Sequence, residues 1–414
     1  MASPGAGNHP NGPPVRQQGV RSAMSDALMN TYARLPVAFT EGRGAWLWDT
    51  DGNAYLDALS GIAVCGLGHA HPAVTVALCD QAGQLVHTSN LYRIPQQERL
   101  ADRLTTAAGM DRAFFCNSGA EANEAALKIA RRVAHERGIE KPVVVVMEGS
   151  FHGRTLATLA ATGNPAVQAG FGTPLPGFER VPYGDSRAVA ALAGRADVVA
   201  VLVEPVTGEG GIQIPPADYL PDLRRICDQQ GWLLMLDEIQ TGVGRTGTLF
   251  AFQGVTDVQP DVLTLAKGLG NGVPIGACLA RGEAAEALTP GSHGTTFGGN
   301  PLVCAASHAV LDTLEAGDLP SHAVAMGERI ADALRARLEG RAGVVAIRQR
   351  GLMLGIELEA PCKELVGRAL EAGLLINVTA ERVVRLLPPL IIDADEADRI
   401  AAGVADLIEA HVAP

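Results

Sequence analysis

Four apolar runs separated by helical stretches occupy the middle of the chain. They are KPVVVVMEG (141–149), DVVAVLVEP (197–205), GWLLMLDEI (231–239) and DVLTLAK (261–267). A strand that is apolar on both faces is typical of a parallel sheet buried between two layers of helices. The pattern therefore predicts that these runs form the central strands of an α/β sheet.

Helical patterns, with apolar positions three and four residues apart, lie between these runs and around them. They cover residues 72–86, 122–137, 216–230 and 301–317. Alternation of strands and helices is the pattern of an α/β fold with a mainly parallel sheet. We expect one large layered domain in this part of the chain.

The pattern changes after about residue 320. A long helical pattern over 321–340 is followed by strand patterns near 344–358 and 374–390, and then by a last helical pattern over 394–411. Runs of strands and helices that do not alternate strictly are typical of α+β folds. The C-terminal part therefore reads as a smaller α+β domain.

The N-terminal part contains two different textures. Residues 1–30 are rich in Gly, Pro, Asn and Gln and lack the apolar stretch of a secretory signal, which predicts a disordered leader. Short strands around an Asp51–Gly52 turn follow. We expect residues 31–59 to pack with a C-terminal small domain (316–414), and residues 60–315 to form the large domain.

Composition excludes several classes of protein. The 414 residues carry a net charge of −12, which argues against nucleic acid as a partner but permits an anionic substrate held by local arginines. Seven cysteines without a C-x-x-C pair suit buried thiols in a reducing cytoplasm, not a disulfide or zinc framework. No apolar run approaches the roughly 18–20 residues that span a bilayer, so we do not expect the protein to span a membrane. Because the cysteine spacing does not match a zinc site, we do not expect a bound metal either.

Polar residues stand at the carboxyl ends of three predicted strands. They are Glu204, the pair Asp237–Glu238, and Lys267. Ligands of open parallel sheets bind at that edge. Lys267 lies between an apolar run and a glycine-rich bend, so it either extends its stem to the surface or is desolvated, which would make it a nucleophile. Two acids at neighbouring strand ends favour the second interpretation.

The stretch CNSGAEANEAALK (116–128) leads from a polar bend into an alanine-rich helix. At the start of that helix Ser118, Gly119 and Ala120 would present backbone N–H groups without partners, which is an anion site. The alternative is an ordinary helix cap by Asn117 or Ser118.

Two further stretches carry candidate ligand contacts. In GSFHGRT (149–155), Phe151 could cover a planar ligand and Arg154 could bind a carboxylate, unless the loop merely holds a solvated arginine. Thr295 and Thr296 precede a helix entrance at Asn300–Pro301 and could donate to a phosphate or only cap the helix.

Competing motifs are weaker. Residues 242–247 fit G-x-G-x-x-G after a strand, but the helix that a nicotinamide site requires does not follow. There is no G-x-x-x-x-G-K-[ST] motif. His69 and His71 form a tempting metal pair, but no further ligands cluster near them, so a turn before a helix is the better interpretation.

Taken in order, the motifs resemble those of the class III, fold-type I pyridoxal-phosphate aminotransferases. The resemblance covers nearly all of the chain after residue 31 and rests on NSGAEANEAALK, FHGRT, EPVTGEGG, LDEIQTGVGRTG, LAKGLGNGVPIG, TTFGGNP and VVRLLPPL. It implies a large domain with a mainly parallel seven-stranded sheet between helices and a smaller α+β domain.

The resemblance also implies roles for residues around the cofactor. Lys267 would carry the cofactor as a Schiff base and then shuttle the substrate proton. Asp237 would pair with the pyridine nitrogen, as a buried strand-end carboxylate needs a cation unless it caps a helix. Gln240 would contact the ring hydroxyl, while Ile239 and Phe151 would enclose the ring.

At the phosphate, the resemblance implies contacts from Ser118, Gly119 and Ala120 and from Thr296 of a second subunit. A site built in this way is incomplete in one chain. We therefore expect a homodimer with shared active sites.

Substrate contacts are implied in the same way. Arg154 would hold a substrate carboxylate with Thr295 nearby, while Arg385 would bind the α-carboxylate of glutamate and otherwise pair with Glu209. The wording of the motifs is most similar to the acetylornithine branch, which implies transfer of an amino group from N2-acetylornithine to 2-oxoglutarate in arginine biosynthesis. Enzymes for succinyldiaminopimelate, succinylornithine, ornithine or 4-aminobutyrate share the set, and a non-catalytic cofactor-binding relative is a remote alternative.

Overall fold

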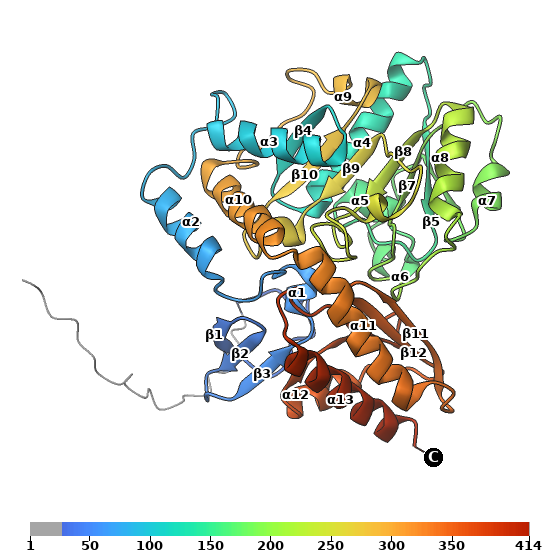
Figure 1. The fold of residues 1–414 in the computed structure, drawn as a ribbon. Helices are drawn as coiled ribbons and strands as arrows, with labels where there is room; N and C mark the ends of the chain where they lie inside the picture. Colours follow the sequence, from blue (N-terminus) through green and yellow to red (C-terminus); the bar gives the residue numbers. More distant parts are fainter. Residues whose placement is uncertain (1–26, 414) are drawn as a thin grey trace, which may run out of the picture.

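The computed structural model describes residues 27–413, which form three β-sheets and their covering helices (Figure 1). Most of the predicted leader, residues 1–26, lies outside the described residues, and Ala27–Asn30 are exposed. Among the described helices, none combines the length and apolar character needed to cross a bilayer.

The largest sheet has seven strands, and its order sets the position of every strand end. The order is β4 (Arg112–Cys116), β10 (Gly276–Ala280), β9 (Val262–Leu265), β8 (Leu233–Asp237), β7 (Val198–Val203), β5 (Val143–Met147) and β6 (Phe178–Val181). Only β10 runs antiparallel to its neighbours. The predicted mainly parallel sheet is confirmed, and the four apolar runs form β5, β7, β8 and β9.

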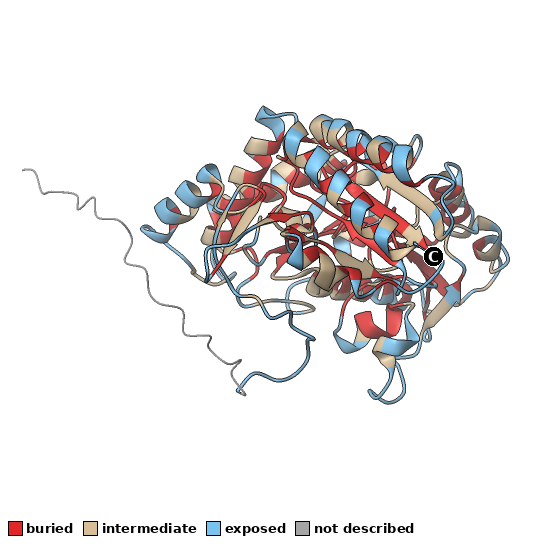
Figure 2. Cartoon of the chain, turned by 90° about the horizontal axis from the view of Figure 1, so that it is seen from below, coloured by how far each residue is buried: buried red, intermediate tan, exposed pale blue. Residues whose placement is uncertain are grey.

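Helices cover both faces of this sheet, as its apolar strands require. In β5, Val144 and Val146 face the cluster that contains Ala126 of α4 (Gly119–Glu136). The alternate residues Val145 and Met147 face the cluster that contains α8 (Tyr219–Gln230). Figure 2 shows the buried residues concentrated in the strands between these layers.

The longer predicted helices are present, with shifted ends in every case except the last, α13. They are α2 (Pro72–Ala82), α4, α8, α10 (Pro301–Ala316), α11 (Leu319–Leu338) and α13 (Ala394–His411). A further long helix, α3 (Pro95–Ala108), is not predicted from the apolar pattern. The shorter helical elements are α1 (Ser60–Ala63), α5 (Leu156–Ala161), α6 (Pro165–Gln168), α7 (Ser186–Ala190), η1 (Ala251–Gly254), η2 (Lys267–Leu269), α9 (Glu283–Glu286) and α12 (Leu365–Glu371).

Two four-stranded sheets lie in the remaining part of the chain. One has the order β1 (Phe39–Arg43), β2 (Trp46–Asp49), β3 (Ala54–Asp57) and β13 (Leu374–Leu375). The other has the order β11 (Val344–Arg350), β12 (Met353–Leu358), β15 (Val383–Leu386) and β14 (Asn377–Thr379). Because β3 pairs directly with β13, we propose grouping residues 31–59 with the C-terminal part as one small domain.

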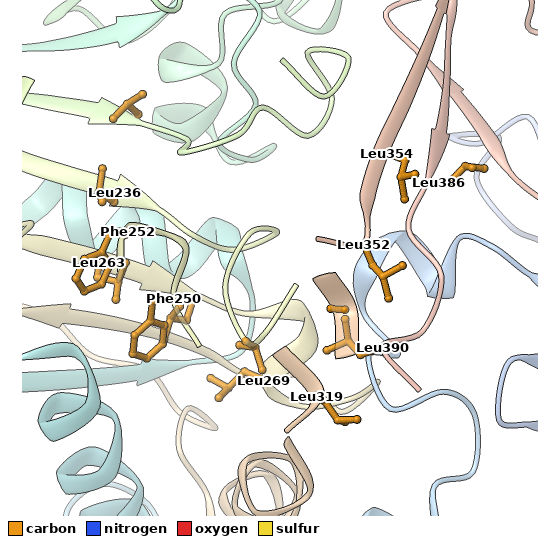
Figure 3. Close-up of a cluster of buried hydrophobic side chains, with 14 of the residues drawn as sticks. Leu236, Phe250, Phe252, Leu263, Leu269, Leu319, Leu352, Leu354, Leu386 and Leu390 are labelled. Atoms are coloured by element: carbon orange, nitrogen blue, oxygen red, sulfur yellow. The ribbon is translucent and has the colours of Figure 1, made fainter. Parts of the chain in front are cut away.

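The large sheet and the C-terminal sheet share one apolar core. Figure 3 shows Leu236 and Leu263 of the large sheet continuing through Leu269 toward Leu390 and Leu386. Both sides of the molecule are therefore packed into one unit, which fixes the C-terminal strands relative to the carboxyl edge of the large sheet.

A buried arginine reinforces this connection. Arg245, in the loop after β8, places Nη1 3.0 Å from the carbonyl oxygen of Leu352 and 2.5 Å from that of Pro388. Pro388 follows β15 closely. These bonds hold the end of β15 against the loop that follows β8.

Candidate functional site

A cavity of about 400 Å³ opens at the carboxyl edge of the seven-stranded sheet. This is the edge at which ligands of open parallel sheets bind, and the volume suits a small-molecule site. The lining residues are Val64, Asn117, Ser118, Gly119, Ala120, Phe151, His152, Gly153, Arg154, Glu204, Glu209, Asp237, Ile239, Gln240, Ala266, Lys267, Gly272, Val273, Pro274 and Ile275.

One end of the cavity is the start of α4. Ser118 is the residue before the helix, and its hydroxyl oxygen accepts a hydrogen bond from the backbone N–H of Glu121 at 3.2 Å. This confirms the cap by Ser118. The first N–H groups of a helix have no partner within it and carry the positive end of the helix dipole. The helix start can therefore hold an anion as well.

Asp237 ends β8 with its carboxylate held on three sides. Oδ2 accepts from Asn123 Nδ2 at 2.7 Å and lies 2.8 Å from His152 Nδ1, while Oδ1 accepts from the N–H of Ile239 at 3.1 Å. The alternative that Asp237 caps a following helix is wrong, because turns and bends continue through residue 250. These contacts hold the buried carboxylate in one orientation.

Turns also follow the G-x-G-x-x-G stretch over 242–247, and the next helical element is the short η1. The helix that a nicotinamide site requires directly after this stretch is therefore not formed in the described structure.

Lys267 lies just beyond the end of β9 and lines the cavity. Its backbone adopts a φ of +44°, in the left-handed region that residues with side chains seldom occupy and that clusters at functional sites. Burial, followed by the positive charge of Arg385, lowers the pKa of its amine to about 8. The amine is therefore poised to accept and release a proton near neutral pH.

The walls are apolar and tightly fitted. Ile239 contacts the start of α4 so closely that a Cβ at Gly119 would lie 2.8 Å from its side chain, so only glycine fits there. On another side the Arg154 guanidinium lies 5.5 Å from the centre of the Phe151 ring. Gln240 is buried with its Oε1 atom unpaired among the described residues, which marks a place for a ligand donor.

An ion pair between a buried arginine and a partly exposed glutamate acts electrostatically on the Lys267 amine. Arg385 of β15 is fully buried, with Nη1 2.7 Å from Glu209 Oε1 and Nε 3.0 Å from Asn377 Oδ1 of β14. Glu209 lines the cavity and its side chain is 38% exposed. Arg385 Nη2 has no partner in the described part of the chain, so the guanidinium retains capacity to bind a carboxylate.

The structure brings most of the predicted site residues together. Ten of them line the cavity: Ser118, Gly119, Ala120, Phe151, Arg154, Glu209, Asp237, Ile239, Gln240 and Lys267. Arg385 reaches the cavity through Glu209, and Thr295 accepts a hydrogen bond from Asn117 at 3.2 Å. Thr296 is exposed and does not line the cavity of its own chain.

Three polar residues of the site received no role from the sequence. His152 and Asn123 contact Asp237, and Glu204 lines the cavity. Glu204 had been noted only as a strand-end acid. Asn123 carried a signal of its own, because it is a polar residue on the buried alanine face of α4.

Comparisons with known proteins agree with this geometry. A family model described as class-III aminotransferase matches residues 28–408. The acetylornithine aminotransferase of Nitrosomonas europaea is 58% identical over 382 residues, which cover 92% of this chain and 97% of that protein.

Two solved structures are similar as well. A structure of the Toxoplasma gondii ornithine aminotransferase, described as having partial occupancy of pyridoxal phosphate at its active site, has a TM-score of 0.90 and 36% identity over 93% of this chain and 92% of that one. The N-acetylornithine aminotransferase of Stenotrophomonas maltophilia has a TM-score of 0.80 and 36% identity over 92% and 98%.

Proposed function

Because the chain belongs to the class-III aminotransferases, we propose that it transfers the terminal amino group of N2-acetylornithine to 2-oxoglutarate, giving N-acetylglutamate 5-semialdehyde and glutamate. The observation that carries the proposal is the Arg385–Glu209 pair beside Lys267, since such a pair lets one site accept two different substrates. The similarity to an acetylornithine aminotransferase at 58% identity supports the donor. A cytoplasmic location and a place in arginine biosynthesis stay predictions.

The cavity fits pyridoxal phosphate, the cofactor of this family. Gln240 offers an unpaired buried acceptor, Asp237 offers a fixed negative charge for a protonated ring nitrogen, and the start of α4 offers N–H groups to a phosphate. When bound, the cofactor supplies an electron sink for carbanion chemistry.

The side chains of this protein supply the remaining chemistry. The free Nζ of Lys267 would take a proton from the amine-bearing carbon of the donor and deliver it to the cofactor, which its pKa of about 8 permits. In the second half-reaction it would give a proton to the carbon of 2-oxoglutarate that receives the amino group. Asp237, held by Asn123 and His152, keeps the ring nitrogen protonated. Phe151 and Ile239, which line the cavity, would enclose the ring and exclude water from it.

Two arginines divide the recognition of substrate. In the amine-donor half-reaction Arg154, with Thr295 nearby, holds the α-carboxylate of acetylornithine while Arg385 stays paired with Glu209. In the glutamate half-reaction Glu209 moves away, Arg385 takes the α-carboxylate, and Arg154 takes the side-chain carboxylate. The partial exposure of Glu209 leaves it room to move.

A substrate panel with 2-oxoglutarate as acceptor tests the proposal most directly. We expect N2-acetylornithine to react with a higher kcat/KM than ornithine, succinylornithine, succinyldiaminopimelate or 4-aminobutyrate. The measurement is the initial rate of glutamate formation for each donor. A clear preference for ornithine or 4-aminobutyrate would refute the donor assignment and leave the transamination chemistry standing.

We also propose that the active form is a homodimer. Exposed apolar side chains occur on two loops: Leu85, Val86, Leu91 and Tyr92 on the first and Phe297 on the second, with Leu91 87% exposed and Phe297 60%. Two hydrogen bonds join the chain near these loops, from Asn90 to the Gly298 carbonyl at 3.1 Å and from Gln97 to that of Gly299 at 2.9 Å. The exposed Thr296 is next to Phe297 in the sequence, so a second copy that covers these loops would place Thr296 in contact with that copy.

Mixing two defective variants tests the shared site. Thr296→Ala is expected to weaken pyridoxal-phosphate binding by roughly 10- to 150-fold, since a hydrogen bond to a charged group is worth about 1.5–3 kcal/mol. Mixed with Lys267→Ala, which is inactive by itself, it should form dimers in which one site has both residues, and activity should return. Thr289→Ala serves as the control for the same loop. A fully active monomer in sedimentation, or no recovery on mixing, would contradict the model.

A further inference from the structure

Two buried glutamates occupy equivalent positions at the ends of adjacent strands. Glu204 follows β7 and Glu238 follows β8, and their exposed fractions are 6% and 0%. Burial raises the pKa of both carboxyls. Each accepts hydrogen bonds from two backbone N–H groups. Glu204 holds two separate loops and Glu238 holds one, and these loops differ in whether they carry residues of the cavity.

The loops fixed by Glu204 both carry substrate-binding residues. Its Oε2 accepts from the N–H of Phe151 at 3.1 Å, three residues before Arg154. Its Oε1 accepts from the N–H of Gly208 at 3.0 Å, immediately before Glu209. The carboxylate of Glu204 therefore joins the segment that carries Arg154 to the segment that carries Glu209, and both residues belong to the proposed substrate-binding set.

The same two segments touch through their backbones. A Cβ at Gly210 would lie 2.7 Å from the carbonyl oxygen of Gly149, so no side chain can separate them. Glu238, by contrast, accepts from the N–H groups of Ala251 and Phe252, which belong to η1 and do not line the cavity. Replacement of Glu238 therefore serves as a control, because it should affect stability without affecting the residues of the cavity.

We propose that Glu204 is a positioning residue that sets the spacing between Arg154 and the Arg385–Glu209 pair, and so selects acceptors that carry two carboxylates. This inference rests on the proposed function of the same site. An ionised carboxylate can accept both N–H bonds at once, one on each oxygen. A neutral amide has one acceptor oxygen and one NH2 donor, so one of the two N–H groups would face a donor. Loss of either bond lets the two loops shift independently.

Four charged or titratable groups act on Glu204. They are His152 and Asp237, which contact each other, together with Lys267 and Tyr183. Protonation of Glu204 on the acid side would turn one of its oxygens into a donor facing an N–H group. Binding of a dicarboxylate should therefore weaken as the pH falls, and this loss should be absent from a variant with an amide at position 204.

The experiment compares Glu204→Gln with Glu238→Gln in the holoenzyme. The first readout is KM for 2-oxoglutarate and for pyruvate, an acceptor with one carboxylate, with whichever donor reacts best. The second is calorimetric binding of glutarate, which needs no turnover. Glu204→Gln should raise KM for 2-oxoglutarate and the glutarate Kd by roughly 10- to 100-fold, with little change for pyruvate. Glu238→Gln should lower Tm and leave KM for both acceptors and the glutarate Kd unchanged.

Equal losses for both acceptors in Glu204→Gln, or unchanged glutarate binding, would overturn the inference. If Glu204→Gln does not fold, Glu204→Asp, which keeps the charge but is one methylene shorter, takes its place with the same readouts. If the substrate panel shows that the donor is not acetylornithine, the comparison of KM values and glutarate Kd between variant and wild type is not affected. Failure of the donor assignment and failure of this inference are therefore distinguishable.

Discussion

Lys267→Ala is expected to abolish transamination while leaving the protein able to bind its cofactor. The residues that would hold the phosphate and ring are unchanged, but among the described residues no other amine lines the cavity. Removal of a proton-transferring side chain costs about 100- to 10,000-fold in rate, and loss of the covalent attachment adds to it. Single-turnover rates with acetylornithine, and cofactor binding followed by absorbance, measure the two effects separately.

Three controls make this result specific. Borohydride should attach the cofactor irreversibly to the wild-type chain at Lys267 and leave the variant unlabelled. The exposed Lys363→Ala should behave like the wild type. Added methylamine should restore part of the lost rate. Substantial turnover by Lys267→Ala without added amine would remove this residue from its role.

The pH dependence follows from the same amine. Its folded pKa of about 8 is below the ordinary value of 10.5, because burial disfavours the charged form. The fraction of free base thus increases as the pH rises toward 8, and the single-turnover rate should rise with it and level off above. In the amine-rescued variant, the profile should follow the pKa of the added amine.

Arg154→Ala and Arg385→Ala are expected to damage the two half-reactions differently. In the proposed mechanism Arg154 binds a carboxylate in both, so its loss should slow both by roughly 30- to 5,000-fold, which corresponds to about 2–5 kcal/mol for a partly desolvated charged contact. In the same proposal Arg385 is released from Glu209 only when glutamate binds. Its loss should therefore affect mainly the glutamate half-reaction, measured as single-turnover kcat/KM.

Glu209→Gln provides the complementary test. It removes the charge that pairs with Arg385 at 2.7 Å and should leave the arginine available to glutamate at all times. Glutamate should then bind more tightly, and the preference for acetylornithine should narrow. Thermal unfolding of each variant separates these effects from instability, since Arg385 is fully buried. Equal losses in both half-reactions for Arg385→Ala would refute the switch.

The fold was predictable wherever the apolar pattern was long and regular. The runs that became β5, β7, β8 and β9 have no competing interpretation, and the last helix was predicted at the bounds of α13. The strands β4, RAFFC, and β10, GACLA, were not predicted because neither is a continuous run of large aliphatic residues. The pairing of β10 with β4 on one side and with β9 on the other makes them strands.

The site was predictable as far as its residues lie in compact motifs. Ser118, Phe151, Asp237 and Lys267 each stand at a strand end or helix start, so their gathering at one sheet edge follows from the parallel topology. The partners of Asp237 could not be derived in this way. Asn123 lies within a helix, and its contact with Asp237 depends on how α4 packs over the sheet.

The sequence by itself determined the elements, their order, and the edge of the sheet at which the chemistry lies, because periodicity and strand-end residues are local properties. Only the tertiary structure decided which distant groups meet. Arg385 pairs with Glu209 across 176 residues, and Glu204 reaches Phe151 across 53. Such contacts depend on the register of β15 and on loop packing, where a shift of one residue would turn each side chain to the other face, and no local pattern records that choice.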